Sequence, residues 1–176
     1  MKYVYLFGDG AAAAIVTYDD TGNSKYLNGL QKTYSEGAYL ARIDGGGLKN
    51  PYRNHVYNQE LYSFKMEGKK LLRLAKKKIP PFMNEFFSGL NISIEEVDHI
   101  IPHQASKTGM MIFEKLYPKL KGEVHNTLLN YGNCIAASIP LTLASIIESG
   151  KLKRGETCLL CGTSAGFSIG GVLLVF

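Results

Sequence analysis

The sequence lacks long apolar runs and paired cysteines, and each absence narrows the class of protein. No apolar stretch reaches the length of about eighteen residues that a membrane span needs, and the N-terminus lacks the basic start, apolar centre and cleavage site of a secretory signal. Three cysteines, an odd number, argue against a disulfide scaffold and for a reducing compartment. We therefore expect a cytoplasmic protein.

Size and charge bound the remaining possibilities. The 176 residues fit one domain, and an apolar content of 45% is enough to build a substantial core. A net charge of +5 favours an anionic partner, and a phosphopantetheine carrier, a coenzyme A and a nucleic acid all fit. The most basic run, residues 65–78, has leucines at helical spacing, which predicts the solvated face of a helix.

The cysteines themselves predict no metal or redox site. Cys158 and Cys161 form a C-x-x-C pattern inside an apolar run typical of a strand. Because side chains alternate along a strand, a separation of three residues points the two sulfurs to opposite faces. Both are expected to be structural, and Cys134 is expected to pack in the interior.

Apolar patterns of strand and helix type alternate along the chain. Strands are predicted at Tyr3–Phe7, Ala11–Tyr18, Val97–Ile101, Val124–Leu129, Thr157–Cys161 and Ser168–Phe176, and helices at Phe64–Phe87, Gln104–Leu116 and Cys134–Glu148. Asp19–Tyr62 has neither period and predicts a long loop with room for one strand. Pro80-Pro81 is expected to kink or break its helix, and Ser93–Glu96 matches a capping box. The pattern predicts an α/β fold with a mixed, mainly parallel sheet, helices on its faces and a C-terminal antiparallel hairpin at one edge.

Two polar side chains follow successive predicted strands. His103 follows the predicted strand Val97–Ile101 and lies beside a helix N-terminus, which favours the neutral imidazole. Asn133 follows the next predicted strand, Val124–Leu129. Both can donate a hydrogen bond to one carbonyl oxygen at the carboxyl edge of the sheet. A structural histidine and an N-capping asparagine are the alternatives.

Glycines mark two further stretches. The run Gly162–Gly171 offers free backbone N–H groups, although a plain hairpin turn explains it as well. Gly8-Asp9-Gly10-Ala11 superficially fits a dinucleotide-binding pattern. A strand-like segment follows where that pattern needs a helix, so we reject a dinucleotide site.

Four ordered motifs together resemble one family. Phe7–Ala12, His103-Gln104-Ala105, Tyr131-Gly132-Asn133 and the C-terminal glycine-rich hairpin resemble the β-ketoacyl-acyl-carrier-protein synthase III branch of the thiolase-like condensing enzymes. The resemblance implies a C-terminal half, in which residues 1–18 are the last strands of a missing N-terminal half and residues 19–176 form the C-terminal domain. The family's nucleophilic cysteine would lie before Phe7, so the isolated chain is expected to be inactive.

The resemblance also implies roles for particular residues. His103 and Asn133 would hold the malonyl thioester carbonyl during decarboxylation, and the Ala165 amide, in a Ser-Ala-Gly run where the family has three glycines, would serve an oxyanion hole. The implied carrier-binding residues are Gln104, Ala105, Ser106, Lys107 and Thr108, with Ser106 and Thr108 replacing the family's asparagine and arginine. The spacing of Lys115 and Lys119 predicts a shared basic helix face that could meet an acidic carrier, and a plain solvated surface explains it equally well. The implied partners are an acyl carrier protein, acyl-CoA or acyl-carrier thioesters and a second copy in a homodimer, without metal, cofactor, nucleic acid or membrane.

Two other functions stay open at this point. The departures at Ser106, Thr108 and Ser164-Ala165 fit an acyltransferase of the same fold that has lost decarboxylative condensation. The positive charge and the absent nucleophile fit a non-catalytic interaction module that binds nucleic acid.

Overall fold

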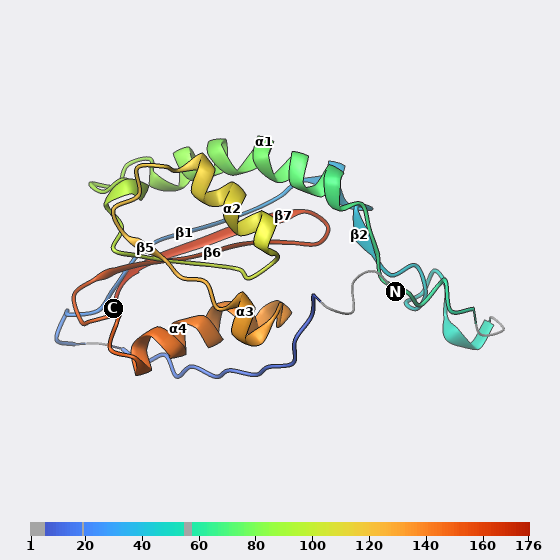
Figure 1. The fold of residues 1–176 in the computed structure, drawn as a ribbon, viewed down its shortest axis with the longest axis horizontal. Helices are drawn as coiled ribbons and strands as arrows, with labels where there is room; N and C mark the ends of the chain where they lie inside the picture. Colours follow the sequence, from blue (N-terminus) through green and yellow to red (C-terminus); the bar gives the residue numbers. More distant parts are fainter. Residues whose placement is uncertain (1–5, 19, 55–57) are drawn as a thin grey trace.

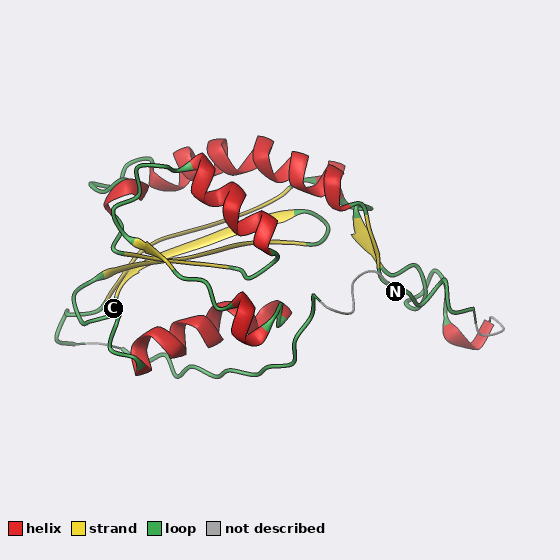
Figure 2. Cartoon of the chain, in the orientation of Figure 1, coloured by secondary structure: helices red, strands yellow, loops and turns green. Residues whose placement is uncertain are grey.

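A five-stranded sheet lies between two layers of helices in the computed structural model, which describes residues 6–18, 20–54 and 58–176 (Figure 1). The strands of this sheet are β1 (Lys25–Thr33), β4 (His99–Pro102), β5 (Glu123–Val124), β6 (Thr157–Ser164) and β7 (Ser168–Val175). The helices are α1 (Gly68–Phe87) and α2 (Lys107–Leu116) on one face and α3 (Leu128–Tyr131) and α4 (Ser138–Glu148) on the other. Figure 2 distinguishes these layers by secondary structure.

The strand order is β1-β7-β6-β4-β5, with β4 parallel to both β5 and β6 and β7 antiparallel to both β6 and β1. The α/β class, the mixed sheet and the β6–β7 hairpin are therefore confirmed. The hairpin is not at the edge, however, because β1 pairs along the whole of β7 and forms the edge itself. The parallel order places the residues that follow β4 next to the end of β6.

The predicted strand at Ala11–Tyr18 is wrong, because residues 8–18 contain no helix or strand. Ile15 and Val16 are each 93% exposed, and a strand forms only where another strand satisfies its backbone groups. The prediction for Tyr3–Phe7 lies largely outside the described residues; within it, Phe7 forms an isolated bridge with Asn133.

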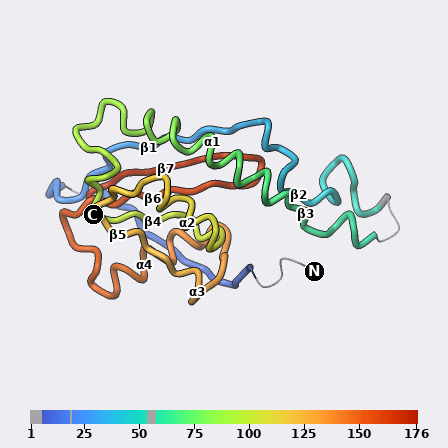
Figure 3. The backbone as a smooth tube through the Cα atoms, turned by 45° about the horizontal axis from the view of Figure 1, so that its top comes forward, coloured from blue at the N-terminus to red at the C-terminus, as the bar shows by residue number. Residues whose placement is uncertain are grey.

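Two further predictions need correction. The supposed loop at Asp19–Tyr62 contains the nine-residue strand β1 and the short strand β2 (Ala41–Arg42). Strand β2 pairs with β3 (Lys65–Met66), and the described residues between them, 43–54 and 58–64, extend away from the main sheet (Figure 3). The strand predicted at Val124–Leu129 shrinks to β5, because Leu128 already starts α3.

Helix α1 runs through Pro80 and Pro81 without a break, so the expectation of a break there is wrong. Each proline removes one intrahelical hydrogen bond, but the following turns bury Phe82 and Phe86 almost completely. Burying each aromatic side chain is worth about 1.5–3 kcal/mol, which offsets the loss. Further along the chain, the capping box is confirmed, since Glu96 Oε2 accepts from the Ser93 N–H at 2.9 Å.

The core has two parts, one on each face of the sheet. Ile100 and Cys161 face the part under α1 and α2, whereas Ile101 and Cys158 face the part under α4. This alternation confirms that the two cysteines point to opposite faces, and Cys134, Cys158 and Cys161 are all free and buried. No helix within the described ranges is both long and apolar enough to cross a membrane.

Candidate functional site

His103 lies in the loop between β4 and α2, against the end of β6. Its backbone N–H donates to the Cys161 carbonyl at 2.7 Å, and a side chain at Gly162 would come within 2.8 Å of the His103 Cβ. The imidazole nitrogens have no hydrogen-bond partner among the described residues. Burial lowers the pKa of His103 from its usual 6.5, so the ring is neutral at pH 7 and keeps a donor for a ligand.

Asn133 follows α3 and is 7% exposed. Its Oδ1 accepts from the Ile135 N–H at 2.9 Å, and its Nδ2 donates to the Ala105 carbonyl at 3.3 Å. The first bond holds the backbone N–H of Ile135, where the short 3-10 turn that precedes α4 begins, so a structural role exists. With Oδ1 held in this way, Nδ2 points toward the His103 loop, where it donates to the carbonyl of Ala105, two residues after His103.

The N-terminal segment supports Asn133 from the other side. The Asn133 N–H donates to the Leu6 carbonyl at 2.9 Å, and the Gly8 N–H donates to the Asn133 carbonyl at 3.1 Å. Gly8 is required here, because a Cβ would lie 1.8 Å from the Tyr131 oxygen. Direct backbone pairing thus joins the Gly8 motif to the Asn133 motif, a contact that the sequence patterns did not predict.

Ile135, two residues after Asn133, has a φ of 52°, the one positive value among the described non-glycine residues. A β-branched side chain in this region costs on the order of 1–3 kcal/mol. Such strain persists where the surroundings fix the backbone, and here the Asn133 side chain does so directly. Backbone strain therefore lies next to the proposed donor.

Ala165 lies in the turn between β6 and β7 and is exposed. The left-handed position in this turn is Gly166, with a φ of 102°, whereas Ser164 and Ala165 keep negative values. Replacing two of the family's glycines therefore imposes no strain on the turn. The structure describes no contact between Ala165 and His103 or Asn133, so a role for the Ala165 amide stays a prediction.

The predicted carrier-binding residues divide by exposure. Gln104 is only 1% exposed, which keeps its side chain from a partner, whereas the partly buried Ser106 caps α2 by accepting from the Gly109 N–H. Lys107 and Thr108 are exposed on the first turn of α2. The expectation that Lys115 and Lys119 share a helix face is wrong, because α2 ends at Leu116.

A groove between α1 and α2 extends the basic surface, and the sequence patterns did not predict this groove. It has a volume of about 370 Å³ and is lined by Thr108 and Ile112 of α2 and, on α1, by Lys69, Leu72, Arg73 and Lys76. None of its three cations forms an ion pair with a described residue, although Lys70 and Lys78 nearby do. The basic run is a solvated helix face, as predicted, but part of that face borders Thr108.

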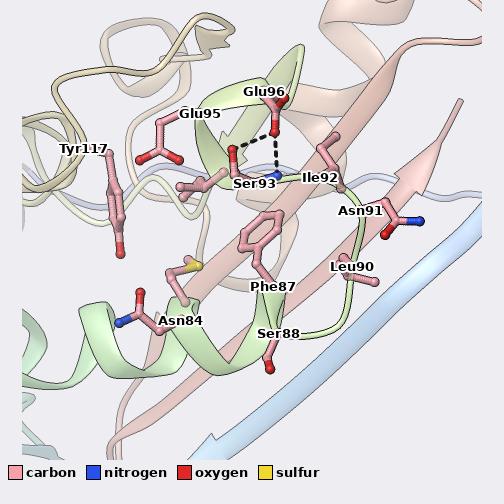
Figure 4. Close-up of a pocket in the computed structure, with 12 residues that line it drawn as sticks. Asn84, Phe87, Ser88, Leu90, Asn91, Ile92, Ser93, Glu95, Glu96 and Tyr117 are labelled. Carbon is pink, nitrogen blue, oxygen red and sulfur yellow. Dashed lines mark hydrogen bonds between the residues drawn. The ribbon is translucent and has the colours of Figure 1, made fainter.

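A larger pocket of about 590 Å³ lies where α1 ends (Figure 4). It is lined by Met83, Asn84, Phe87, Ser88, Leu90, Asn91, Ile92, Ser93, Ile94, Glu95, Glu96 and Tyr117. Burial raises the pKa of Tyr117 to about 12, and its hydroxyl has no hydrogen-bond partner among the described residues. Since none of the predicted site residues lines this pocket, size alone does not identify the site.

Two buried histidines form a separate polar cluster near the start of β4. His99 Nδ1 and His125 Nε2 are 2.9 Å apart, and His99 Nε2 lies 3.0 Å from Glu156 Oε2. Glu123 Oε1 lies 3.6 Å from His125 Nδ1 and accepts from Lys151. Burial lowers the pKa of His125 despite the nearby Glu123 carboxylate. No residue pattern in the sequence predicted this cluster.

The stability of the chain is expected to fall below pH 6.5. The pKa values of His103 and His125 are both lowered from 6.5 in the folded state, so the unfolded chain binds protons first as the pH drops. Each group contributes a slope of at most about 1.4 kcal/mol per pH unit until its folded pKa is reached. Urea unfolding between pH 8 and 5 measures this slope, and His125→Gln is expected to remove about half of it. A free energy of unfolding that is level from pH 7 to 5 contradicts the prediction.

Comparison with known proteins identifies the family. Residues 88–176 match the profile of the 3-oxoacyl-[acyl-carrier-protein] synthase III C-terminal region. The chain is 34% identical over 172 residues to beta-ketoacyl-[acyl-carrier-protein] synthase III of Syntrophomonas wolfei, covering 96% of this chain and 51% of that protein. It is 29% identical to acetoacetyl CoA synthase NphT7 of a Streptomyces species, over 98% of this chain and 53% of that enzyme.

A solved structure supports the same family. The 3-oxoacyl-[acyl-carrier-protein] synthase III of Aquifex aeolicus superposes with a TM-score of 0.75 at 26% identity, covering 91% of this chain and 47% of that one. The fold is therefore that of a thiolase-like condensing enzyme. The chain belongs to the 3-oxoacyl-acyl-carrier-protein synthase III family, as the sequence motifs predicted, and corresponds to its C-terminal half. It spans about half the length of the curated relatives it matches.

Proposed function

We propose that this chain is the decarboxylating half of an enzyme that condenses an acyl thioester with malonyl-acyl-carrier protein. The observation that carries the proposal is the hydrogen bond from Asn133 Nδ2 to the Ala105 carbonyl, which aims an amide donor at the loop of a neutral, unpaired His103. The domain division at residue 18 belongs to the same proposal. Residues 6–18 would complete their backbone pairing with the half of the enzyme that this chain does not span.

His103 and Asn133 would act on the malonyl thioester as paired donors. Both N–H groups would bond the thioester carbonyl oxygen, while the bond between the α-carbon and the carboxylate breaks and releases carbon dioxide. The electron pair left on the α-carbon is delocalised onto that oxygen, where fixed donors stabilise it without reorganisation. The carbanion then attacks the acyl carbon, and the thiolate that carried the acyl group leaves.

The cysteines of this chain do not fit the role of the acyl-carrying nucleophile. Burial raises the pKa of Cys158 and of Cys161 to about 12, so both are protonated at pH 7. The Cys134 thiol donates to the Tyr131 carbonyl at 3.2 Å. The nucleophile is therefore proposed to reside in the other half of the complete condensing enzyme, which we refer to as the parent enzyme.

Carbon dioxide release tests the proposal. The parent enzyme, given an acyl thioester and carboxyl-labelled malonyl-carrier, is expected to release labelled carbon dioxide and form a 3-oxoacyl thioester. The isolated chain is the matched control and is expected to form none. Transfer of the acyl group to an alcohol or amine without carbon dioxide release would instead support the acyltransferase alternative, and salt-sensitive nucleic-acid binding without either activity would support an interaction module.

The groove between α1 and α2 is proposed to contribute to carrier docking. Its three unpaired cations border the exposed Thr108, and an acidic carrier surface would be attracted to them. Replacing Arg73 and Lys76 by glutamate is expected to raise the KM for malonyl-carrier about tenfold or more at low salt, with kcat little changed. Lys70→Glu together with Lys77→Glu is a matched control on the same helix. An equal effect of both double variants would contradict groove-specific docking.

A further inference from the structure

Gln104 has an unusual environment for a glutamine, because its carboxamide is buried and fully engaged. It is 1% exposed. Its Nε2 donates to the Pro102 carbonyl at 2.8 Å and to the His125 carbonyl at 3.1 Å, and its Oε1 accepts from the Thr127 N–H at 3.0 Å. Both N–H groups of the carboxamide are used within the chain.

These bonds join two segments that are far apart in sequence. Pro102 immediately precedes His103, whereas His125 and Thr127 begin the connection that leads through α3 to Asn133. The Thr127 hydroxyl is also within 2.7 Å of the Thr142 hydroxyl, which links this connection to α4. The Gln104 carboxamide therefore fastens the start of the His103 loop to the start of the Asn133 connection.

A second tie closes the arrangement. The residue after Gln104, Ala105, accepts the hydrogen bond from Asn133 Nδ2 at 3.3 Å. At 3.3 Å this bond is long and provides weak support, whereas the Gln104 bonds are shorter and shielded from water. Backbone bonds hold each segment in place, and among the side-chain hydrogen bonds Gln104 provides the firmer link between the His103 loop and the Asn133 connection.

We infer that Gln104 is a positioning residue that sets the separation between the His103 imidazole and the Asn133 carboxamide. The catalytic consequence rests on the proposed function, whereas the structural consequence does not. A carboxylate has the same shape as the carboxamide but offers no N–H, so Gln104→Glu would turn two donated bonds into contacts between an anion and carbonyl oxygens. Gln104→Met has similar length and tests the loss of the bonds without a buried charge.

Kinetics in the parent enzyme provide the first test. Misplacing a catalytic group by about 1 Å costs on the order of 100-fold in rate. Gln104→Glu and Gln104→Met are expected to lower kcat for carbon dioxide release by about that factor, with the KM for malonyl-carrier nearly unchanged. Gln31→Glu, an exposed site on β1, is the matched control and is expected to retain wild-type kcat. Wild-type kcat in either folded Gln104 variant would overturn the inference.

Nuclear magnetic resonance of the 176-residue chain provides a second test that needs no activity. The His103 ring and the Asn133 side-chain amide signals are expected to shift in both Gln104 variants and to stay fixed in Gln31→Glu. If the parent enzyme releases no carbon dioxide but these signals shift, the proposed function fails and the positioning role stands. Unmoved His103 and Asn133 signals in a folded Gln104 variant would show that Gln104 is only structural.

Discussion

Replacing His103 by alanine is expected to lower carbon dioxide release by the parent enzyme by about two to three orders of magnitude. The imidazole is neutral because burial lowers its pKa, and no described residue occupies its nitrogens, so its N–H is available to the developing enolate. Removing a preorganised donor of this kind costs about 3 kcal/mol in the barrier. Initial rates with carboxyl-labelled malonyl-carrier provide the measurement.

Asn133 offers a matched variant that separates catalysis from support of the local backbone. Asn133→Asp retains an oxygen to accept from the Ile135 N–H, but it loses the Nδ2 donor. We expect the folded state to persist while the rate of decarboxylation falls by a factor similar to that for His103→Ala. If Asn133→Asp keeps the wild-type rate, Asn133 only holds the local backbone and the two-donor account is wrong.

Phe86→Ala is expected to lower the free energy of unfolding by about 3–5 kcal/mol. The side chain is 0% exposed, its ring centroid lies 6.1 Å from that of Phe82 and 5.1 Å from that of Phe87, and its edge approaches Gly171 on β7. The surrounding sheet and helix cannot collapse fully into the cavity, which adds to the lost burial.

Urea unfolding of the isolated chain measures this loss. Tyr39→Ala, at a side chain that is 71% exposed, is the control and is expected to change the free energy of unfolding by less than about 0.5 kcal/mol. A loss below about 1 kcal/mol for Phe86→Ala would mean that α1 does not pack on the sheet as described. Because β7 adjoins β6, this packing also supports the strand against which His103 lies.

Residue patterns predicted the elements whose apolar periodicity is evident in their own stretch of sequence. The β6–β7 hairpin and α1 have strong local periodicity, and each is found near its predicted bounds. The strand predicted at Ala11–Tyr18 fails because its apolar residues find no pairing strand among the described residues. Room for one strand was expected in the loop that contains β1, but its position was not predicted, because glycine, asparagine and glutamine interrupt its alternation and it is held by pairing with β7.

The site was predictable only in part. His103 and Asn133 stand in short motifs after apolar runs, and those motifs were enough to single them out. The burial of Gln104 was not predictable, because glutamine is usually exposed and its three partners come from separate segments. The groove that includes Arg73 and Thr108 depends on the packing of α1 against α2, which no local pattern reveals.

A crystal structure of this chain with a bound malonyl-thioester analogue tests the central claim most directly. The account predicts that His103 and the Nδ2 atom of Asn133 both lie within about 3 Å of the thioester carbonyl oxygen. A carbonyl oxygen bound by neither side chain, or side chains that face apart with other groups packed between them, would contradict it.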